Sequence, residues 1–156
     1  MPHKSHYAKD LHEFAVRMEL LEPGVLYMSN EYKKIVAQRV HERIVMETPV
    51  DTSQALSNWQ IATATTGAVD NPIPAFVVGK GGSSEMASII ATRAAAAIVL
   101  QTAPIGYPIS ISNVVDYIGD LAYRDKSIQA TGDWVGRAMI MGLRQGMIEA
   151  NQKVVW

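Results

Sequence analysis

The stretch TPVDTSQALSNWQ, residues 48–60, decides how the first half of the chain folds. Pro49 disfavours helical geometry in the residue before it, so the amphipathic segment that leads into it must end there. Asp51 stands three residues before Gln54, which is the spacing of a side-chain cap at the start of a short helical turn. We therefore expect a helix to end, a corner to form at Pro49, Asp51 and Thr52, and a new element to follow.

A half-buried strand is predicted directly after this corner. In NWQIATAT, residues 58–65, large or β-branched side chains alternate with smaller or polar ones, which is the period of a strand with one buried face. Trp59 is then expected to be a core anchor that packs on the preceding helix, which we place at residues 30–47. His41, alone on that helix without a second histidine at metal-binding spacing, is predicted to lie on its surface. The charged residues of this helix are predicted to form a solvated face: Lys33, Lys34, Arg39, Glu42 and Arg43.

The remaining elements follow from apolar spacing. Residues 7–21 carry Leu11, Phe14, Ala15, Met18 and Leu21 at helical spacing. Further helices are expected at 84–103, buried on most of its circumference, at 115–122 and at 132–152, with a second strand at 109–112. The prediction is an α+β fold: a small antiparallel sheet packed against several helices, with a long loop and a long C-terminal helix. We expect one domain over residues 1–156, with residues 1–6 as a flexible tail.

The last helix contains interior glycines. Gly136, Gly142 and Gly146 each cost about 1 kcal/mol relative to alanine in a helix. Such a pattern indicates that another backbone comes close, either within the fold or from a second subunit, so Gly142 and Gly146 are candidate interface residues. Apolar spacing predicts a buried face on this helix that consists of Trp134, Val135, Ala138, Met139 or Met141, and Ile148, with Thr131 as its cap.

A loop rich in Gly, Pro, Ser and Thr is predicted at residues 65–84. Loops of this length are uncommon inside a compact domain and tend to be functional or mobile. We expect it to be mobile in the free subunit and to order against a partner. Its apolar patch, Ala75, Phe76, Val77 and Val78, is the predicted contact.

Composition narrows the classes of function. The chain has 156 residues, 48% of them hydrophobic, and 14 Lys and Arg against 15 Asp and Glu, interspersed along the sequence. That balance gives no reason to expect sequence-independent binding of nucleic acid. Cysteine is absent, which removes disulfides and thiolate chemistry. Without a signal-peptide pattern or an apolar run of spanning length, we expect a soluble protein with no membrane contact, made in the cytoplasm.

No catalytic, cofactor or metal site is predicted. VGKGGSS, residues 78–84, places Lys80 before its paired glycines, the reverse of a phosphate-binding loop. His3, His6 and His12 lack a carboxylate at metal-ligand spacing. Ser53, Ser57, Asp116 and Asp120 form no sequence-visible triad. An enzyme would need a pocket assembled from distant residues, and the alternative set is His41, Asp116, Tyr117 and Arg124.

The order of the motifs resembles that of the lambdoid neck and tail-completion proteins of tailed bacteriophages. The corner is similar to their PVDTGRAR-NWQ corner, and as in them it is followed by a variable loop, an Ala-rich helix, a strand–helix unit (PISISNVVDYIGDL, 108–121), a turn (DKSIQATGDWV, 125–135) and a final helix. The likeness covers roughly residues 30–148. The chain departs from the pattern at Ser53, where glycine is usual, at Asp116 in the asparagine-tyrosine signature, at Asp125 and Lys126 in a glycine-rich turn, and at Thr131, where proline is usual.

The resemblance implies a structural virion protein that joins head to tail. Its expected partners are further copies of itself in a sixfold or twelvefold ring, the portal or adaptor protein, and the tail tube or tail terminator. Double-stranded DNA would pass through the lumen, and the protein, made in the host cytoplasm, would end in the virion. A monomeric binding or regulatory module is the alternative of a different class, and an enzyme with an unrecognised site is a third.

Overall fold

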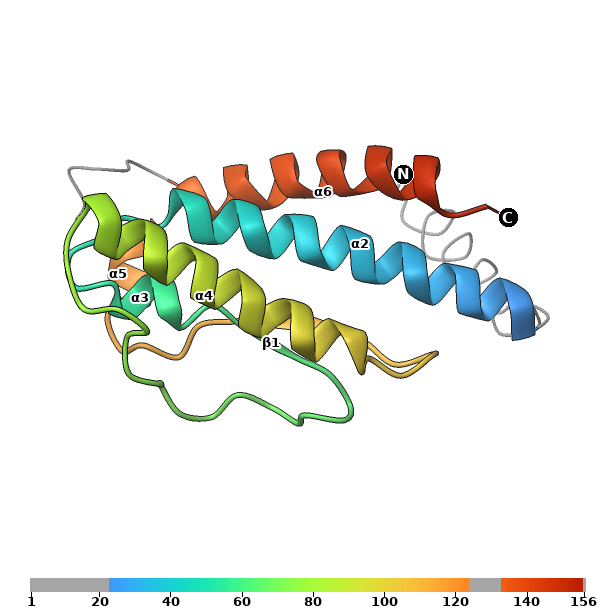
Figure 1. The fold of residues 1–156 in the computed structure, drawn as a ribbon, viewed down its shortest axis with the longest axis horizontal. Helices are drawn as coiled ribbons and strands as arrows, with labels where there is room; N and C mark the ends of the chain where they lie inside the picture. The colour runs from blue at the N-terminus through green and yellow to red at the C-terminus, as the bar shows by residue number, and fades with distance from the viewer. Residues whose placement is uncertain (1–22, 124–132, 156) are drawn as a thin grey trace, which may run out of the picture.

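The computed structural model describes residues 23–123 and 133–155 (Figure 1). In chain order its elements are α2 (Pro23–Glu47), α3 (Gln54–Ser57), β1 (Gln60–Ala62), α4 (Gly82–Gln101), β2 (Ser110–Ser112), α5 (Ile118–Tyr123) and α6 (Trp134–Lys153). The described part is thus an α+β fold with a small antiparallel sheet and a long C-terminal helix, as predicted. The predictions for residues 1–6, for the helix at 7–21 and for His3, His6, His12, Arg124, Asp125, Lys126 and Thr131 lie outside the described residues.

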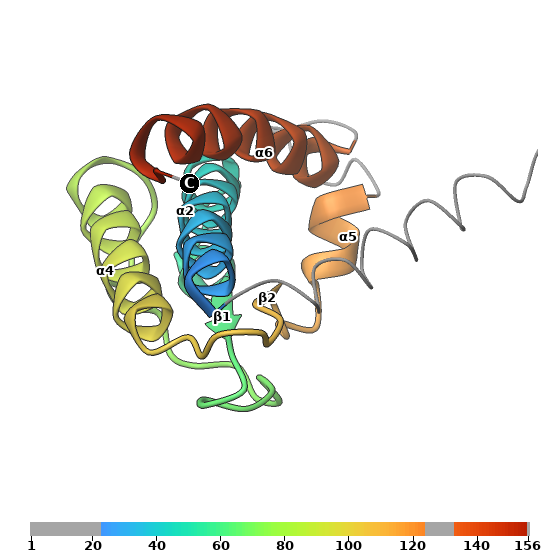
Figure 2. The ribbon, with the colours of Figure 1, turned by 90° about the vertical axis from the view of Figure 1, so that its right-hand side faces the viewer.

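Helix α2 is the centre of the fold. In the view along this helix, α4 and α6 lie on two sides of it and the two-stranded sheet lies below (Figure 2). The helix begins at Pro23, earlier than the predicted start near residue 30, because proline is well suited to the first helical turn, where its missing N–H is not needed. It ends at Glu47 as predicted. There the Thr48 hydroxyl donates to the Ile44 carbonyl at 2.7 Å and Pro49 follows.

The sheet consists of one short antiparallel pair. Its register places Gln60 opposite Ser112, Ile61 opposite Ile111 and Ala62 opposite Ser110. Trp59 directly precedes β1 and is buried in the main apolar cluster with Val40 and Ile44 of α2. Its ring meets that of Trp134 edge to face, with centroids 6.3 Å apart. The prediction that Trp59 anchors the strand on the helix is therefore confirmed.

The corner is built differently from the prediction. The residue that caps α3 is Ser53, whose backbone is left-handed at φ 64°, and its side chain makes no cap hydrogen bond. Asp51 is exposed, and its carboxylate lies 3.5 Å from the Lys80 ammonium, so the predicted Asp51 cap is wrong. Pro49 is buried and Thr52 is exposed. Because α3 begins at Gln54 and its cap position is Ser53, Asp51 stands two residues before the cap.

Helices α2 and α6 approach each other at glycine. A Cβ atom at Gly142 would lie 2.6 Å from the Val40 Cα, and one at Gly146 would lie 2.8 Å from the Val36 Cα. Both glycines are buried, so the backbone that comes close belongs to the same chain, and the sites are not open to a second subunit.

The buried face of α6 therefore differs in part from the predicted one. It consists of Trp134, Val135, Ala138, Gly142, Gly146 and Ala150. The first three are as predicted, but Met139, Met141 and Ile148 are exposed, because small residues rather than large ones face α2. The helix is capped by Asp133, whose Oδ1 accepts from the Gly136 amide at 2.8 Å.

Candidate interaction surfaces

The loop between β1 and α4 is held along its backbone by polar side chains of α3 and its neighbours. Asn58, fully buried after α3, donates to the Ile73 carbonyl at 2.9 Å and accepts from the Ile73 amide at 2.7 Å. Gln54 donates to the same carbonyl at 2.6 Å and accepts from the Ala75 amide at 3.1 Å. Two side-chain amides thus bind the loop backbone much as a neighbouring strand would.

Three serines make further hydrogen bonds to the backbone of the same loop. The Phe76 amide donates to Ser57 Oγ at 3.1 Å, and Ser88 of α4 donates to the Val77 carbonyl at 2.8 Å. Ser53 Oγ donates to the Gly79 carbonyl at 2.8 Å. The prediction of a loose loop that orders only on contact is therefore wrong for the stretch from Ile73 to Gly79. Val78 is 76% exposed and Phe76 is 43% exposed, while Ala75 and Val77 are half-buried.

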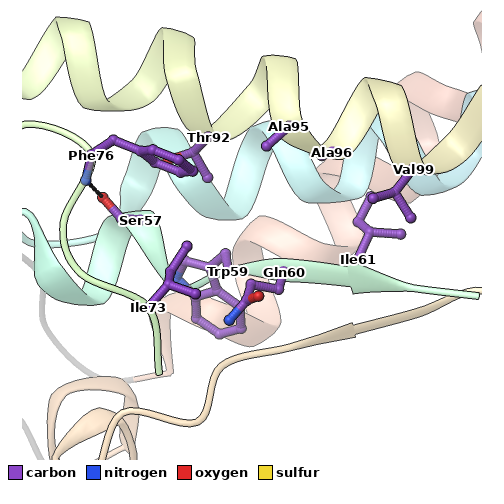
Figure 3. Close-up of a pocket in the computed structure, with 10 residues that line it drawn as sticks. All are labelled: Ser57, Trp59, Gln60, Ile61, Ile73, Phe76, Thr92, Ala95, Ala96 and Val99. Carbon is purple, nitrogen blue, oxygen red and sulfur yellow. Dashed lines mark hydrogen bonds between the residues drawn. The ribbon is translucent and has the colours of Figure 1, made fainter. Parts of the chain in front are cut away.

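A small cavity of about 80 Å³ lies between this loop, β1 and α4 (Figure 3). Phe76 and Ile73 from the loop, Trp59 and Ile61 from the strand side, and Thr92 of α4 are among the residues around it. Ligand pockets are commonly about 300–1,000 Å³. This cavity is much smaller, and we interpret it as a packing gap beneath the loop.

A charged network joins α2 to α4 and α6. The Glu42 carboxylate, buried on α2, pairs with Arg39 and, at 3.0 Å, with Arg93 of α4. Burial would raise the pKa of Glu42, but hydrogen bonds from Arg93 and Gln38 and the charge of Arg39 lower it overall. These groups were predicted to be a solvated face, and that prediction is wrong for Glu42, because α4 covers that side of α2.

The second branch of this network crosses to α6. Arg39 pairs with Glu149, which also pairs with Lys153 at 2.5 Å. The hydrogen bond from Arg39, followed by that from Lys153, lowers the pKa of Glu149 to about 2. The same bond raises the pKa of Arg39. These pairs fix the helices relative to one another and hold no unpaired reactive carboxylate.

His41 lies in the core, not on the surface as predicted. Its side chain is 1% exposed, and its Nε2 lies 2.7 Å from the Trp59 carbonyl oxygen. Burial lowers the pKa of His41 despite the hydrogen bond to Trp59, so the ring is neutral near pH 7 and Nε2 donates to that oxygen. Asp116 and Tyr117 are exposed. The structure therefore does not bring His41 into an accessible pocket with them.

Helix α4 presents an uncovered apolar face. Its buried residues, Ser88, Ile89, Thr92, Ala96 and Leu100, lie on the side that contacts α2, α3 and β1. Met86, Ile90, Ala94 and Ile98, spaced four residues apart, lie on the other side, and Ile90 and Ile98 are 60% and 66% exposed. We call these four residues the α4 ridge. The prediction that α4 is buried on most of its circumference is wrong.

Helix α6 contributes to a second apolar surface, a groove of about 470 Å³ between α2, α6 and the β2 strand. Val36 and Val40 of α2, Ile109 and Ile111 at β2, and Leu143 and Met147 of α6 line it, together with Ser29, Tyr32, Lys33 and Ala37. We call this the α2–α6 groove. Of these lining residues, Leu143 and Met147 are 41% and 49% exposed.

Over residues 23–123 and 133–155, α4 is the one helix long and apolar enough to cross a membrane by length and composition, properties that core helices of soluble proteins also have. No group of three or more His, Asp and Glu side chains in these ranges is placed to hold a metal ion.

Comparisons with protein-family models, with curated proteins and with solved structures found no match.

The exposed face of α4 was not predicted from the sequence. The reason is that an alanine-rich helix with almost no charge has few polar residues to mark the side that faces solvent. A periodic signal was nevertheless present, since the four ridge residues recur at intervals of four and the polar Ser88 and Thr92 fall on the opposite side.

Proposed function

We propose that this chain is a structural subunit of a tailed-bacteriophage neck, which joins the portal or adaptor of the head to the tail around the DNA channel. The proposal rests on the order of motifs around the corner at residues 48–60. One structural observation supports that resemblance. Ser53 has φ 64°, the left-handed geometry that favours glycine, at the position where the family has glycine.

Two surfaces support an assembling subunit. The α4 ridge and the α2–α6 groove expose apolar side chains in continuous patches, and patches of this kind commonly mark sites where a protein meets a partner. Four polar residues at the centre of the fold serve structure: Glu42, Arg39 and Glu149 form ion pairs that join helices, and His41 hydrogen-bonds the Trp59 carbonyl at the start of β1. These features favour a building block over an enzyme.

Deletion of the gene from the encoding phage genome tests the proposal. We expect DNA-filled heads and separate tails in electron micrographs of the lysate, with joined particles restored when the wild-type chain is supplied from a plasmid. Mass spectrometry of purified virions should detect the chain. Intact, infectious particles from the deletion would overturn the proposal.

Two variants of the chain, each supplied from the plasmid to the deletion phage, make this test more specific. Trp59→Ala should fail to restore joining because the core loses its anchor. Asp51→Ala should restore it, since Asp51 is exposed and pairs only at the surface with Lys80. Loss of joining with Asp51→Ala and a folded chain would instead point to a chemical role for that carboxylate.

A further inference from the structure

We propose that a second cleft between α2 and α6, distinct from the α2–α6 groove, binds an acidic segment of another protein. Its volume of about 670 Å³ lies within the common range for binding sites, about 300–1,000 Å³, and it shares no lining residue with the groove. We call it the arginine cleft, and its defining residues are Arg43 of α2 and Met141, Arg144, Ile148, Glu149 and Lys153 of α6. The site rests on the proposed function only for the expectation that the partner is a head or tail protein.

Arg144 brings an unused positive charge to this cleft. Its side chain is exposed, and it forms no hydrogen bond or ion pair with any other residue that the structure describes. A guanidinium presents five N–H donors in a planar fork that matches the two oxygens of a carboxylate. These donors are therefore available to an acidic group that enters the cleft.

Arg43 lines the same cleft from the other helix and holds a second underused donor. Its Nε lies 2.5 Å from a carboxylate oxygen of Glu47, so its charge is paired. Its Nη2 donates to the Met141 sulfur at 3.5 Å. A thioether is a weak acceptor, whereas the hydrogen bond from a guanidinium to a carboxylate is among the strong ones. A carboxylate in the cleft would give this N–H a better acceptor than it has now.

The region around the cleft carries an excess of positive charge. Its ion-pair network and Arg144 together contain five cations and three carboxylates, which leaves two positive charges in excess: Arg39, Arg43, Arg93, Arg144 and Lys153 against Glu42, Glu47 and Glu149. The whole chain has a net charge of -1, so the excess is local to this face. Charge complementarity between partners therefore favours an acidic one here.

Apolar side chains in the cleft distinguish between kinds of anionic partner. Met141 and Ile148 are 45% and 62% exposed. A protein segment with apolar side chains beside its carboxylates would cover both, and methionine adapts its shape to what it meets. The phosphates and sugars of a nucleic acid backbone would leave them uncovered, and the surface of a bilayer is too broad to enter a cleft between two helices. The combination favours an acidic protein segment.

Nuclear magnetic resonance of the methionine methyl groups tests the site on the whole chain. Met141 lines the arginine cleft and Met147 lines the α2–α6 groove, so their two signals report on different surfaces. The probe is the peptide acetyl-Glu-Leu-Leu-Glu-Leu-Leu-Glu-amide, added to about 5 mM, where even a millimolar Kd gives mostly bound protein. We expect a saturable shift of the Met141 signal and none of the Met147 signal. The same peptide with glutamine in place of glutamate should shift neither.

Charge reversal identifies the residue that holds the peptide. Arg144→Glu should weaken peptide binding by about tenfold or more, because the peptide carboxylate loses its free partner and meets a like charge. Lys80→Glu is the matched control, since Lys80 is also an exposed cation but lies outside the cleft, and it should leave the Kd unchanged. If Arg144→Glu fails to fold by circular dichroism, Arg144→Gln replaces it, with Lys80→Gln as its control.

Several results would overturn the inference. A Met141 signal that does not move, or that moves equally with the glutamate and glutamine peptides, would exclude recognition of carboxylates. A short DNA duplex that binds more tightly than the peptide and depends on Arg144 would assign the cleft to nucleic acid. Co-flotation with phosphatidylglycerol vesicles, lost in Arg144→Glu, would assign it to lipid. A Met141 shift on dilution of the chain alone would assign it to a second copy.

Phage complementation separates this inference from the proposed function. In the deletion phage, Arg144→Glu should fail to restore joining, and revertants should carry lysine or arginine in place of an acidic residue of a head or tail protein. Peptide binding by a chain whose deletion leaves intact particles would overturn the proposed function and leave this inference standing. An Arg144→Glu chain that has lost peptide binding yet restores joining would overturn this inference alone.

Discussion

Replacement of Gly142 by alanine tests the close contact between α2 and α6. An added Cβ would lie 2.6 Å from the Val40 Cα and 3.0 Å from both the Arg39 carbonyl oxygen and the Val40 nitrogen. All three are backbone atoms, which cannot turn aside as a flexible side chain can. Carbon atoms in contact normally lie about 3.5–4.0 Å apart, so the two helices must separate by roughly 1 Å.

Two opposing effects set the magnitude of this change. Overpacking of a well-packed core costs about 1–3 kcal/mol, occasionally more. Alanine in place of glycine stabilises a helix interior by about 1 kcal/mol. We expect the cost of overpacking to exceed the gain in helix propensity. The helices cannot easily move apart, because the Glu42–Arg93 pair holds α2 to α4 and the Arg39–Glu149 pair holds α6 to α2. Because the added Cβ overlaps three backbone atoms, the cost should lie in the upper part of that range, about 2–3 kcal/mol, and the net loss in free energy of unfolding should be about 1–2 kcal/mol.

Urea denaturation followed by tryptophan fluorescence measures the free energy of unfolding, since Trp59 and Trp134 lie together in the core, and a thermal scan with the same signal measures the midpoint temperature. The thermal midpoint should fall by roughly 2–8 °C, given about 2–4 °C per kcal/mol for a chain of this size. Gly119→Ala is the matched control, because a Cβ there meets nothing within 4 Å and the change should be neutral or stabilising. A Gly142→Ala variant as stable as the wild type would refute the close-packing argument.

Three further changes test other parts of the structure by the same denaturation assay. Ser53→Gly should be more stable than Ser53→Ala by about 1–2 kcal/mol, because both lose the hydroxyl but only glycine adopts φ 64° without strain; equal stability would argue against the left-handed corner. The lowered pKa of His41 means that the unfolded chain binds a proton more readily, so stability present above about pH 6.5 should fall as the pH drops through the folded pKa, with a shallower fall in His41→Gln. A steeper fall in that variant would contradict the assignment. Asn58→Ala should cost about 2 kcal/mol and speed hydrogen exchange at the Ile73 amide, since the loop loses its buried partner; unchanged exchange would show that Asn58 does not hold the loop.

Local sequence rules determined where most elements lie. Pro49 ended α2 at the predicted place, and alternation around Ile61 and Ile111 located both strands. The α+β class followed from these elements, and so did the burial of Trp59, since a large aromatic at the entry to a half-buried strand packs inward in almost any such fold. These features depend on neighbours a few residues away, which the sequence shows directly.

Tertiary structure alone decided the environment of the remaining groups. Whether Gly142 faces α2 or another subunit, and whether His41 is buried, depends on which helix covers which face. The loop at residues 73–79 was predicted to be loose from its composition, but its order comes from Asn58 and Ser88, which lie 15 and 11 residues from their partners. The spacing of the α4 ridge residues was visible in the sequence, but their exposure was not, because a helix with so few charges can lie in a core or on a surface, and only the placement of α2 and β1 determines which.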